Sequence, residues 1–219
     1  MTRFVRLRRM LHPRYADLPA EWFARPLRVL DAGAGPADGL LARAFLAPGS
    51  RFEAVNIVPL AEDSAERAAF DAYTVADLDE SDLSFAPDGA YDYVICSHTI
   101  EHLRDGLALV PVLARKVASG GRLYLEWPAP SSERFPVRGV GLHFRDDATH
   151  VRTYALSEVL AALESSGLTV EHAGPRRHWL RIALAPALVA YHALRRRELK
   201  FFDLWDVTGF ALVVRARRG

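Results

Sequence analysis

The sequence predicts one α/β domain built on a doubly wound sheet of seven strands, mostly parallel with an antiparallel last strand. Short apolar runs alternate with helix-like segments of about ten residues, a spacing typical of parallel strands joined by right-handed crossovers. The chain has 219 residues and is 50% hydrophobic and 25% charged, so it can bury the core of one ordinary domain. Ligands of such sheets bind outside the carboxyl ends of the strands.

The first half of the sheet begins with LRVLDAG at 27–33, a short apolar run ending in glycine that predicts a buried strand. Residues 37–46 predict a helix that a Pro-Gly pair ends. A second strand is expected over 51–58 and a second helix over 61–70. A weaker third strand follows at 73–78.

The second half begins after residues 79–90, whose Ser, Asp, Pro and Gly predict a loop. YDYVICS at 91–97 predicts the fourth strand. A helix is expected over 107–118, closed by Gly120-Gly121, and the fifth strand over 122–128.

The last part of the domain contains three further elements after an irregular segment at 129–153. A helix over 156–167 leads into a sixth strand at 168–174. The final strand, 209–217, follows a long excursion, so its direction is not set by a short crossover.

Composition excludes several classes of protein. The formal net charge of +1 argues against a nucleic-acid binder, and the single cysteine, Cys96, excludes a disulfide framework or a Cys-rich zinc site. No run reaches the roughly 20 apolar residues of a membrane-spanning helix, and no long apolar run follows the basic start. We therefore expect a soluble, cytoplasmic protein.

Residues 1–26 form a basic leader that precedes the main domain at 27–219. Its Phe4, Leu7 and Leu11 recur at helical spacing among arginines, which predicts a partly helical segment. The leader is interpreted either as a cover for the edge of the domain or as a membrane-surface contact.

A glycine turn joins the first strand to the first helix. Gly33 and Gly35 allow a tight turn and a close approach of the backbone to a ligand. A dinucleotide-binding turn would carry a third small residue at position 38, where this chain has Asp. A carboxylate there would repel a pyrophosphate, and Asp31 before the glycines suits a cationic ligand.

The motif LDAGAGPADG at 30–39 resembles the first motif of class I S-adenosylmethionine-dependent methyltransferases, which have a Rossmann-like fold. The order of the later segments also resembles that family. The segments are AYDYVICSHTIEHLRD at 90–105, SGGRLYLEWPAP at 119–130 and the run from Thr149 to Gly174, which is similar to the small-molecule branch. The resemblance covers about residues 27–174 and the last strand.

This resemblance implies S-adenosyl-L-methionine as the cofactor. The residues it assigns to cofactor binding are Asp31, Gly33, Gly35, Asn56, Ile57, Asp77, Leu78 and Ser97. Asn56 departs from the family, which usually places an acidic residue there against the ribose hydroxyls. An amide can still hydrogen-bond hydroxyls, but without charge assistance.

Methyl transfer to a hydroxyl needs an aligned acceptor and a base, and histidine is the usual base. In the quinone-type O-methyltransferases that the chain resembles, the His of a Thr-His pair in this segment faces the active site. The matching residue here is His150, which the resemblance therefore predicts as base or acceptor-positioning residue. His98 is a second catalytic candidate. Trp127, His143 and Asp147 are predicted on the acceptor side, although a core tryptophan and turn-capping Asp and His residues are equally compatible with the sequence.

Residues 175–208 are predicted to be a helical lid insertion, and 129–153 an acceptor-side segment. The apolar helix at 178–197, which contains Pro186, is interpreted as a lid, a dimer contact or an interfacial membrane helix. Its flanking arginines would suit anionic head groups. The spacing of the His and Asp residues over 143–150 fits no compact metal motif, so no metal is predicted.

We therefore expect a methyltransferase acting on a small-molecule, glycan or lipid-linked acceptor, at oxygen, in the cytoplasm and in peripheral contact with a membrane. Two alternatives stay open. A non-catalytic methyltransferase-like scaffold is compatible with Asn56, and a nucleotide-dependent oxidoreductase with the glycine turn. The residue at position 38 argues against the latter.

Overall fold

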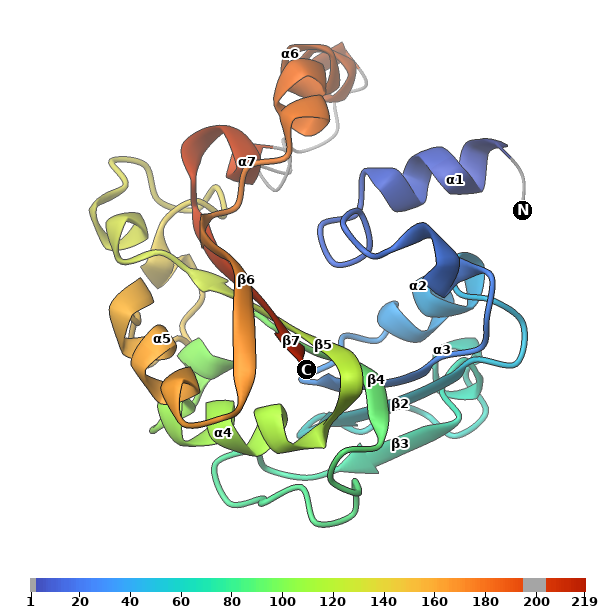
Figure 1. Cartoon of the computed structure of the whole chain (residues 1–219). Coiled ribbons are helices and arrows are strands. Elements are labelled where there is room, and N and C mark those ends of the chain that lie inside the picture. The colour runs from blue at the N-terminus through green and yellow to red at the C-terminus, as the bar shows by residue number, and fades with distance from the viewer. Residues whose placement is uncertain (1–2, 195–203) are drawn as a thin grey trace.

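The computed structural model describes residues 3–194 and 204–219, and within these residues seven strands form one sheet in the order β3-β2-β1-β4-β5-β7-β6 (Figure 1). The strands are β1 (Arg28–Ala32), β2 (Arg51–Asn56), β3 (Ala72–Val75), β4 (Tyr91–Ser97), β5 (Val117–Pro128), β6 (Leu168–Pro175) and β7 (Ala211–Arg218). Strands β1 to β5 pair in parallel, and β7 runs antiparallel to both β5 and β6. The predicted fold class and the antiparallel last strand are confirmed.

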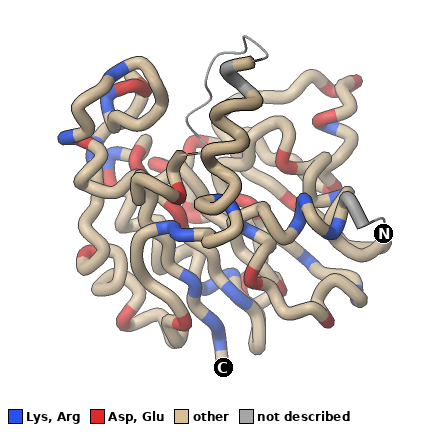
Figure 2. The backbone as a smooth tube through the Cα atoms, turned by 90° about the horizontal axis from the view of Figure 1, so that it is seen from above, with Lys and Arg blue, Asp and Glu red and all other residues tan. Residues whose placement is uncertain are grey.

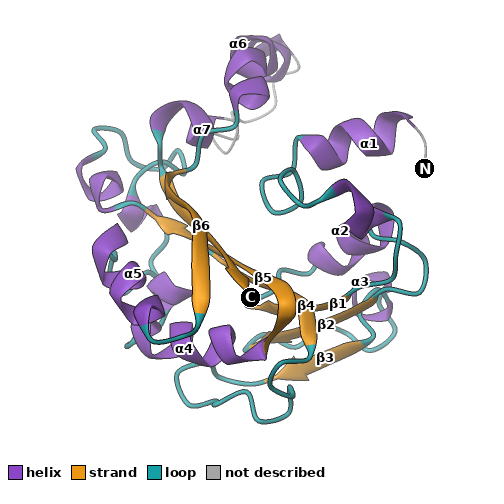
Figure 3. Cartoon of the chain, viewed as in Figure 1, coloured by secondary structure: helices purple, strands orange, loops and turns teal. Residues whose placement is uncertain are grey.

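Helices cover both faces of the sheet, as Figure 3 shows. They are α1 (Arg3–Met10), α2 (Asp38–Phe45), α3 (Ala65–Ala68), α4 (Gly106–Lys116), α5 (Leu156–Glu164), α6 (Trp179–Leu194) and α7 (Trp205–Thr208). Successive strand residues point to opposite faces. Leu30 therefore packs in the core with α4 and α5, and Val29 in the core with the leader and α2.

The start of β5 differs from the sequence prediction. Helix α4 ends at Lys116, and the glycines expected to close it lie inside β5. The backbone at Gly121 lies close to β4: a Cβ on Gly121 would be 2.9 Å from the carbonyl oxygens of Tyr91 and Asp92. Gly121 thus lets β5 lie close against β4, which a periodicity argument does not reveal.

The leader is part of the domain's core. Tyr15 and Trp22 are buried against the sheet. The leader also meets the insertion, because the Arg181 side chain of α6 donates a hydrogen bond to the backbone oxygen of Leu11 at 3.3 Å. Tyr15 and Trp22 share this core with Val29 of β1, and the division into a leader at 1–26 and a domain at 27–219 stays a prediction.

Helix α6 continues through Pro186. Arg195, Arg196 and Arg197, which the predicted helix at 178–197 included, lie outside the described residues. Among the described residues, no helix is both long and apolar enough to cross a membrane.

Candidate functional site

A cavity of about 410 Å³ opens where β1, β2 and β4 end. This volume is within the range of sites for small molecules and cofactors. The residues that line it are Gly33, Asn56, Ile57, Val58, Asp77, Leu78, Asp79, His98, Thr99, His102, Leu103 and Thr149. Six of the predicted site residues are in this set: Gly33, Asn56, Ile57, Asp77, Leu78 and His98.

Gly33 brings the backbone of the glycine turn against β4. Its φ of +89° is in the left-handed region, and its N–H donates to the oxygen of Val55 at 2.8 Å. A Cβ at this position would lie 2.0 Å from Oγ1 of Thr99. Only glycine fits here, because Thr99 occupies the space that a side chain would need.

The carboxylate of Asp31 is buried behind the turn and paired with an arginine from the leader. Nη1 of Arg14 lies 3.3 Å from Asp31 and 2.9 Å from Asp38. Burial raises the pKa of Asp31, and the Arg14 guanidinium opposes this rise. Asp38 also accepts a hydrogen bond from the N–H of Gly35 at 2.8 Å, so it holds the turn. No motif in the sequence distinguished Arg14 from the other arginines of the leader.

Asn56 links the end of β2 to the glycine turn. Its Nδ2 donates to the oxygen of Ala34 at 2.8 Å, and its Oδ1 accepts from the N–H of Val58 at 3.0 Å. A carboxylate could not make the first of these hydrogen bonds, because it has no N–H. The amide therefore has a structural role that an acid could not fill, and one N–H and one oxygen lone pair remain for a ligand.

Asp77 and Leu78 lie on a turn after β3 that faces the cavity. Oδ1 of Asp77 accepts from the N–H of Asp79 at 2.9 Å. Asp79 in turn accepts from the N–H of Arg104 at 2.8 Å, which ties this turn to the loop after β4. The turn thus presents a carboxylate beside an apolar side chain to the cavity.

His98 lies at the end of β4 between two carboxylates. Nδ1 is 3.1 Å from Glu101 and Nε2 is 2.9 Å from Glu126. Burial alone would lower the pKa of His98, but the hydrogen bonds and charges of the two glutamates raise it to about 9. A charged imidazole that donates both N–H groups has no lone pair with which to take a proton.

A buried charge network continues from His98 into the insertion. Oε1 of Glu126 also lies 2.7 Å from Arg176, and Arg176 lies 3.0 Å from Asp206. Asp206 is fully buried and accepts from Nε of Arg181 at 2.8 Å. Arg176 and His98 hold the pKa of Glu126 well below its usual range in spite of burial, which would raise it. The network joins the cavity wall to α6 and α7.

The protonation of His98 predicts a loss of stability at alkaline pH. The folded protein keeps this proton up to about pH 9, whereas the unfolded chain releases it near pH 6.5. The folded state binds more protons between these values, so the free energy of unfolding falls by about 3 kcal/mol as pH rises through this window. Urea unfolding followed across the window measures the loss. In His98→Gln the slope should flatten, and an unchanged slope would contradict the assignment.

Glu101, His102 and His150 come together at the edge of the cavity. One ligand atom from each lies within 4.8 Å of the others, a separation compatible with holding a divalent ion. Nδ1 of His150 donates to the oxygen of Phe144 at 2.6 Å, so a lone pair on this imidazole can only be on Nε2, which lies 4.0 Å from Oδ2 of Asp147. Oε2 of Glu101 is buried without a hydrogen-bond partner.

His102 is oriented by the segment that carries His150. Its Nδ1 lies 2.8 Å from Oγ1 of Thr149, which donates to Asp147 at 2.6 Å. The Thr149 hydroxyl proton is used by Asp147, so Nδ1 of His102 is the donor and Nε2 carries the lone pair. Asp147 therefore orients His102 through the hydroxyl of Thr149 and does not itself line the cavity.

Other predicted residues lie outside the cavity lining. Trp127 is fully buried, and its Nε1 donates to the oxygen of Tyr154 at 2.8 Å. His143 is buried and begins a short helical turn, where its Nδ1 accepts from the N–H of Arg145 at 2.9 Å. Ser97 is buried at the end of β4. Asp31, Gly35 and His150 contact lining segments from behind.

The fold and this cavity define a class of enzyme: the S-adenosyl-L-methionine-dependent methyltransferases. The cofactor fits the site because the cavity has the volume of a cofactor site and the polar ends of β2 and β3 face it. Residues 3–173 match the family model described as a methyltransferase domain, and the chain belongs to this family.

Relatives and solved structures agree with the family. A ubiquinone biosynthesis O-methyltransferase of Xanthomonas campestris is 29% identical over 138 residues, which are 61% of this chain and 57% of that protein. The chain thus spans little more than half of this curated relative. A methyltransferase structure from Mesorhizobium loti has a TM-score of 0.59 at 22% identity and covers 93% of this chain and 94% of that chain.

A geranyl diphosphate C-methyltransferase from Streptomyces coelicolor, solved with S-adenosyl-L-homocysteine, has a TM-score of 0.58 at 16% identity. It covers 91% of this chain and 74% of that chain. At these identities the two structures support the fold alone.

Proposed function

We propose that this methyltransferase transfers the methyl group to a hydroxyl oxygen of a small apolar or lipid-linked acceptor. The observation that carries the proposal is the pair of imidazoles, His102 and His150, whose Nε2 lone pairs are set by hydrogen bonds at Nδ1. A hydroxyl acceptor needs a base, whereas an amine with its own lone pair does not. The printed name of the Xanthomonas relatives supports transfer to oxygen.

The proposed cofactor site consists of the residues around the glycine turn and the ends of β2, β3 and β4. Its members are Asp31, Gly33, Gly35, Asn56, Ile57, Asp77, Leu78 and Ser97. S-adenosyl-L-methionine, when bound, supplies an electrophilic methyl group on its sulfonium sulfur. The acceptor side is formed by His150 with His102, and Asp147, His143 and Trp127 support that segment from behind. His98, which donates both N–H groups, is assigned to positioning the cavity wall.

The proposed transfer is a direct displacement. The acceptor oxygen forms a bond to the methyl carbon while the carbon–sulfur bond breaks and its electron pair stays on sulfur. His150, acting through His102, which lines the cavity, takes the hydroxyl proton. Much of the acceleration comes from alignment in a site that excludes water.

We expect His150→Ala and His102→Ala to lower kcat by about a hundredfold or more while leaving cofactor affinity unchanged. Formation of S-adenosyl-L-homocysteine with a panel of catechols, phenols and lipid-linked sugars measures turnover, and calorimetry measures cofactor binding. His12→Ala is a matched control, because His12 is half-buried in the leader and does not line the cavity. Unchanged turnover in both variants would contradict the base assignment.

The same assay separates the alternatives. Activity that a chelator removes and a divalent ion restores would assign Glu101, His102 and His150 to a metal instead of a proton. Cofactor binding without turnover on any acceptor would favour the scaffold interpretation. Tight binding of NAD would favour the oxidoreductase.

A further inference from the structure

Helix α6 exposes an apolar surface that no described part of the chain covers. Its only Asp, Glu, Lys or Arg residue is Arg181, which turns inward to Asp206. Trp179 and Leu194, at its two ends, are 75% and 85% exposed. In Figure 2 the helix is almost entirely tan, without a red segment.

The exposed residues lie on one side of the helix. Trp179, Ala183, Ala187, Ala190 and Leu194 recur at three- and four-residue spacing, which places them on one stripe. Leu184 and Tyr191 widen the same side. Ala185, which is buried, lies opposite. The outward side of α6 is therefore apolar from end to end, with an indole and a phenol as its polar groups.

Helix α1 borders this surface and adds positive charge. The hydrogen bond from Arg181 to the oxygen of Leu11 brings the start of α6 to the end of α1. Both helices lie on the same end of the molecule in Figure 1. Helix α1 has no acidic residue, and Arg6 and Arg8 are exposed beside Leu7 and Met10, which are 48% and 46% exposed.

We infer that α6 and α1 together form a docking surface for an anionic phospholipid bilayer. An apolar helix face beside a basic helix matches the composition of helices that lie in the membrane interface, where Trp and Tyr are enriched. Sixteen residues give α6 a length of about 24 Å, suited to lying along the surface. A second copy of the chain fits less well, because a symmetric contact over this surface would bring two basic α1 helices together.

The docking surface is joined to the cavity wall. Arg181 of α6 and Arg176 both bind Asp206, and Arg176 binds Glu126 beside His98. Trp205 of α7 lies with its ring 4.7 Å from the ring of His98. Docking would thus place the insertion, and the cavity wall joined to it, beside the membrane from which an apolar acceptor would come. Membrane binding itself requires neither cofactor nor acceptor.

Flotation with vesicles tests the inference without any methyl acceptor. The full chain should float with vesicles containing phosphatidylglycerol and much less with pure phosphatidylcholine. Trp179→Glu and Leu194→Glu should each lower the bound fraction by about tenfold or more, and Arg6→Glu should weaken binding to the anionic vesicles only. The emission of Trp179 should shift to shorter wavelength on binding, since Trp22 and Trp127 are buried already and Trp205 packs on His98 and Phe210.

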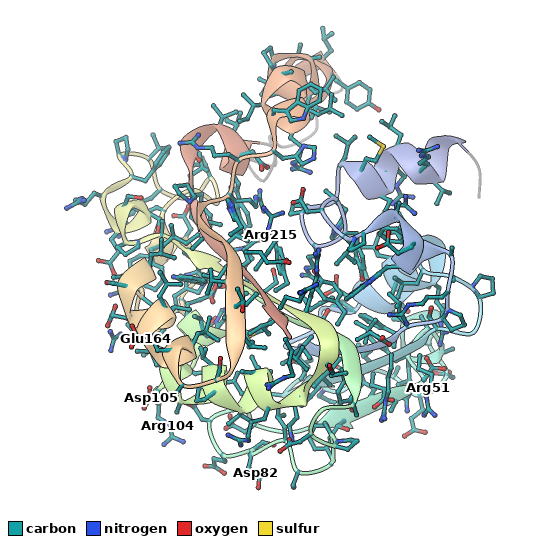
Figure 4. All side chains as sticks on the ribbon, viewed as in Figure 1. Arg51, Asp82, Arg104, Asp105, Glu164 and Arg215 are labelled. Atoms are coloured by element: carbon teal, nitrogen blue, oxygen red, sulfur yellow. The ribbon has the colours of Figure 1, made fainter. Side chains whose placement is uncertain are left out.

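Matched controls come from the opposite end of the molecule. Phe85, 45% exposed, follows Asp82, which Figure 4 labels far from α6, and Arg51 is labelled at the lower right. Phe85→Glu and Arg51→Glu should float like the unaltered protein. Absent flotation, equal loss in these controls, or a concentration-dependent dimer that Trp179→Glu dissociates would overturn the inference. Because flotation needs no turnover, an inactive protein that floats would contradict the proposed function alone.

Discussion

Replacing Gly33 with alanine is expected to abolish binding of S-adenosyl-L-methionine. The new Cβ would lie 2.0 Å from Oγ1 and 2.7 Å from Cγ2 of Thr99, well inside van der Waals contact. Thr99 has little room to move, because it is buried and its hydroxyl donates to the oxygen of Ala32 at 3.1 Å. The turn or Thr99 must therefore shift, and both line the proposed cofactor cavity. Calorimetry should show at least about a hundredfold loss of affinity, the result of losing well over 2 kcal/mol of binding free energy.

A second glycine separates this steric effect from backbone strain. Gly139 has a φ of +76°, similar to that of Gly33, but a Cβ on it meets no atom within 4 Å. The positive φ should cost about 1 kcal/mol of stability in Gly139→Ala, and the same backbone strain is present in Gly33→Ala. Gly139→Ala, however, should leave cofactor affinity unchanged. Thermal unfolding of both variants shows whether each is folded at the temperature of the binding experiment. Normal cofactor affinity in folded Gly33→Ala would mean that the cofactor lies elsewhere.

The sheet and half of the candidate cavity were predictable because they depend on local patterns. Each strand is a short apolar run. The carboxyl ends of parallel strands form the edge of the sheet at which ligands bind, whatever the order of the strands. Gly33, Asn56 and Asp77 end or follow three such strands, so their approach to one cavity follows from the topology. Asn56 was predicted at the end of the second strand and lines the cavity there, and its contact with a ribose stays a prediction. Its hydrogen bond to Ala34 depends on the path of the glycine turn.

The charge network and the histidine pair could not be predicted in the same way. Glu126 and His98 lie on adjacent strands, and their partner Arg176 follows β6. Nothing in the periodicity of a strand indicates which buried carboxylate meets which arginine. His102 is not among the predicted site residues, since its partner Thr149 is 47 residues away and no local pattern joins the two. Trp127 was predicted on the acceptor side, with a core position as the alternative, and it lies in the core. The pattern of a strand does not separate these two positions.

Replacing Glu126 with glutamine is expected to destabilise the protein by about 3 kcal/mol at neutral pH. Oε1 of Glu126 accepts from both His98 and Arg176, and the second oxygen accepts from the hydroxyl of Tyr124. The amide keeps the shape but removes the negative charge between two cations that are largely buried. Breaking a buried ion pair from one side costs about 3–5 kcal/mol, because the remaining charge is uncompensated.

The pH dependence of this loss identifies its cause. His98 of the unaltered protein loses its proton as pH rises through about 9, so above that value one of the two cations is gone. The difference in unfolding free energy between Glu126→Gln and the unaltered protein should then be larger near pH 6 than near pH 10. Glu171→Gln is the control, since Glu171 makes a partly exposed pair with Arg122 at 3.2 Å and should cost less than about 1 kcal/mol at either pH. If the stability lost in Glu126→Gln did not depend on pH, the loss would come from packing around Tyr124. The imidazolium of His98 would then have no part in holding the insertion against the cavity.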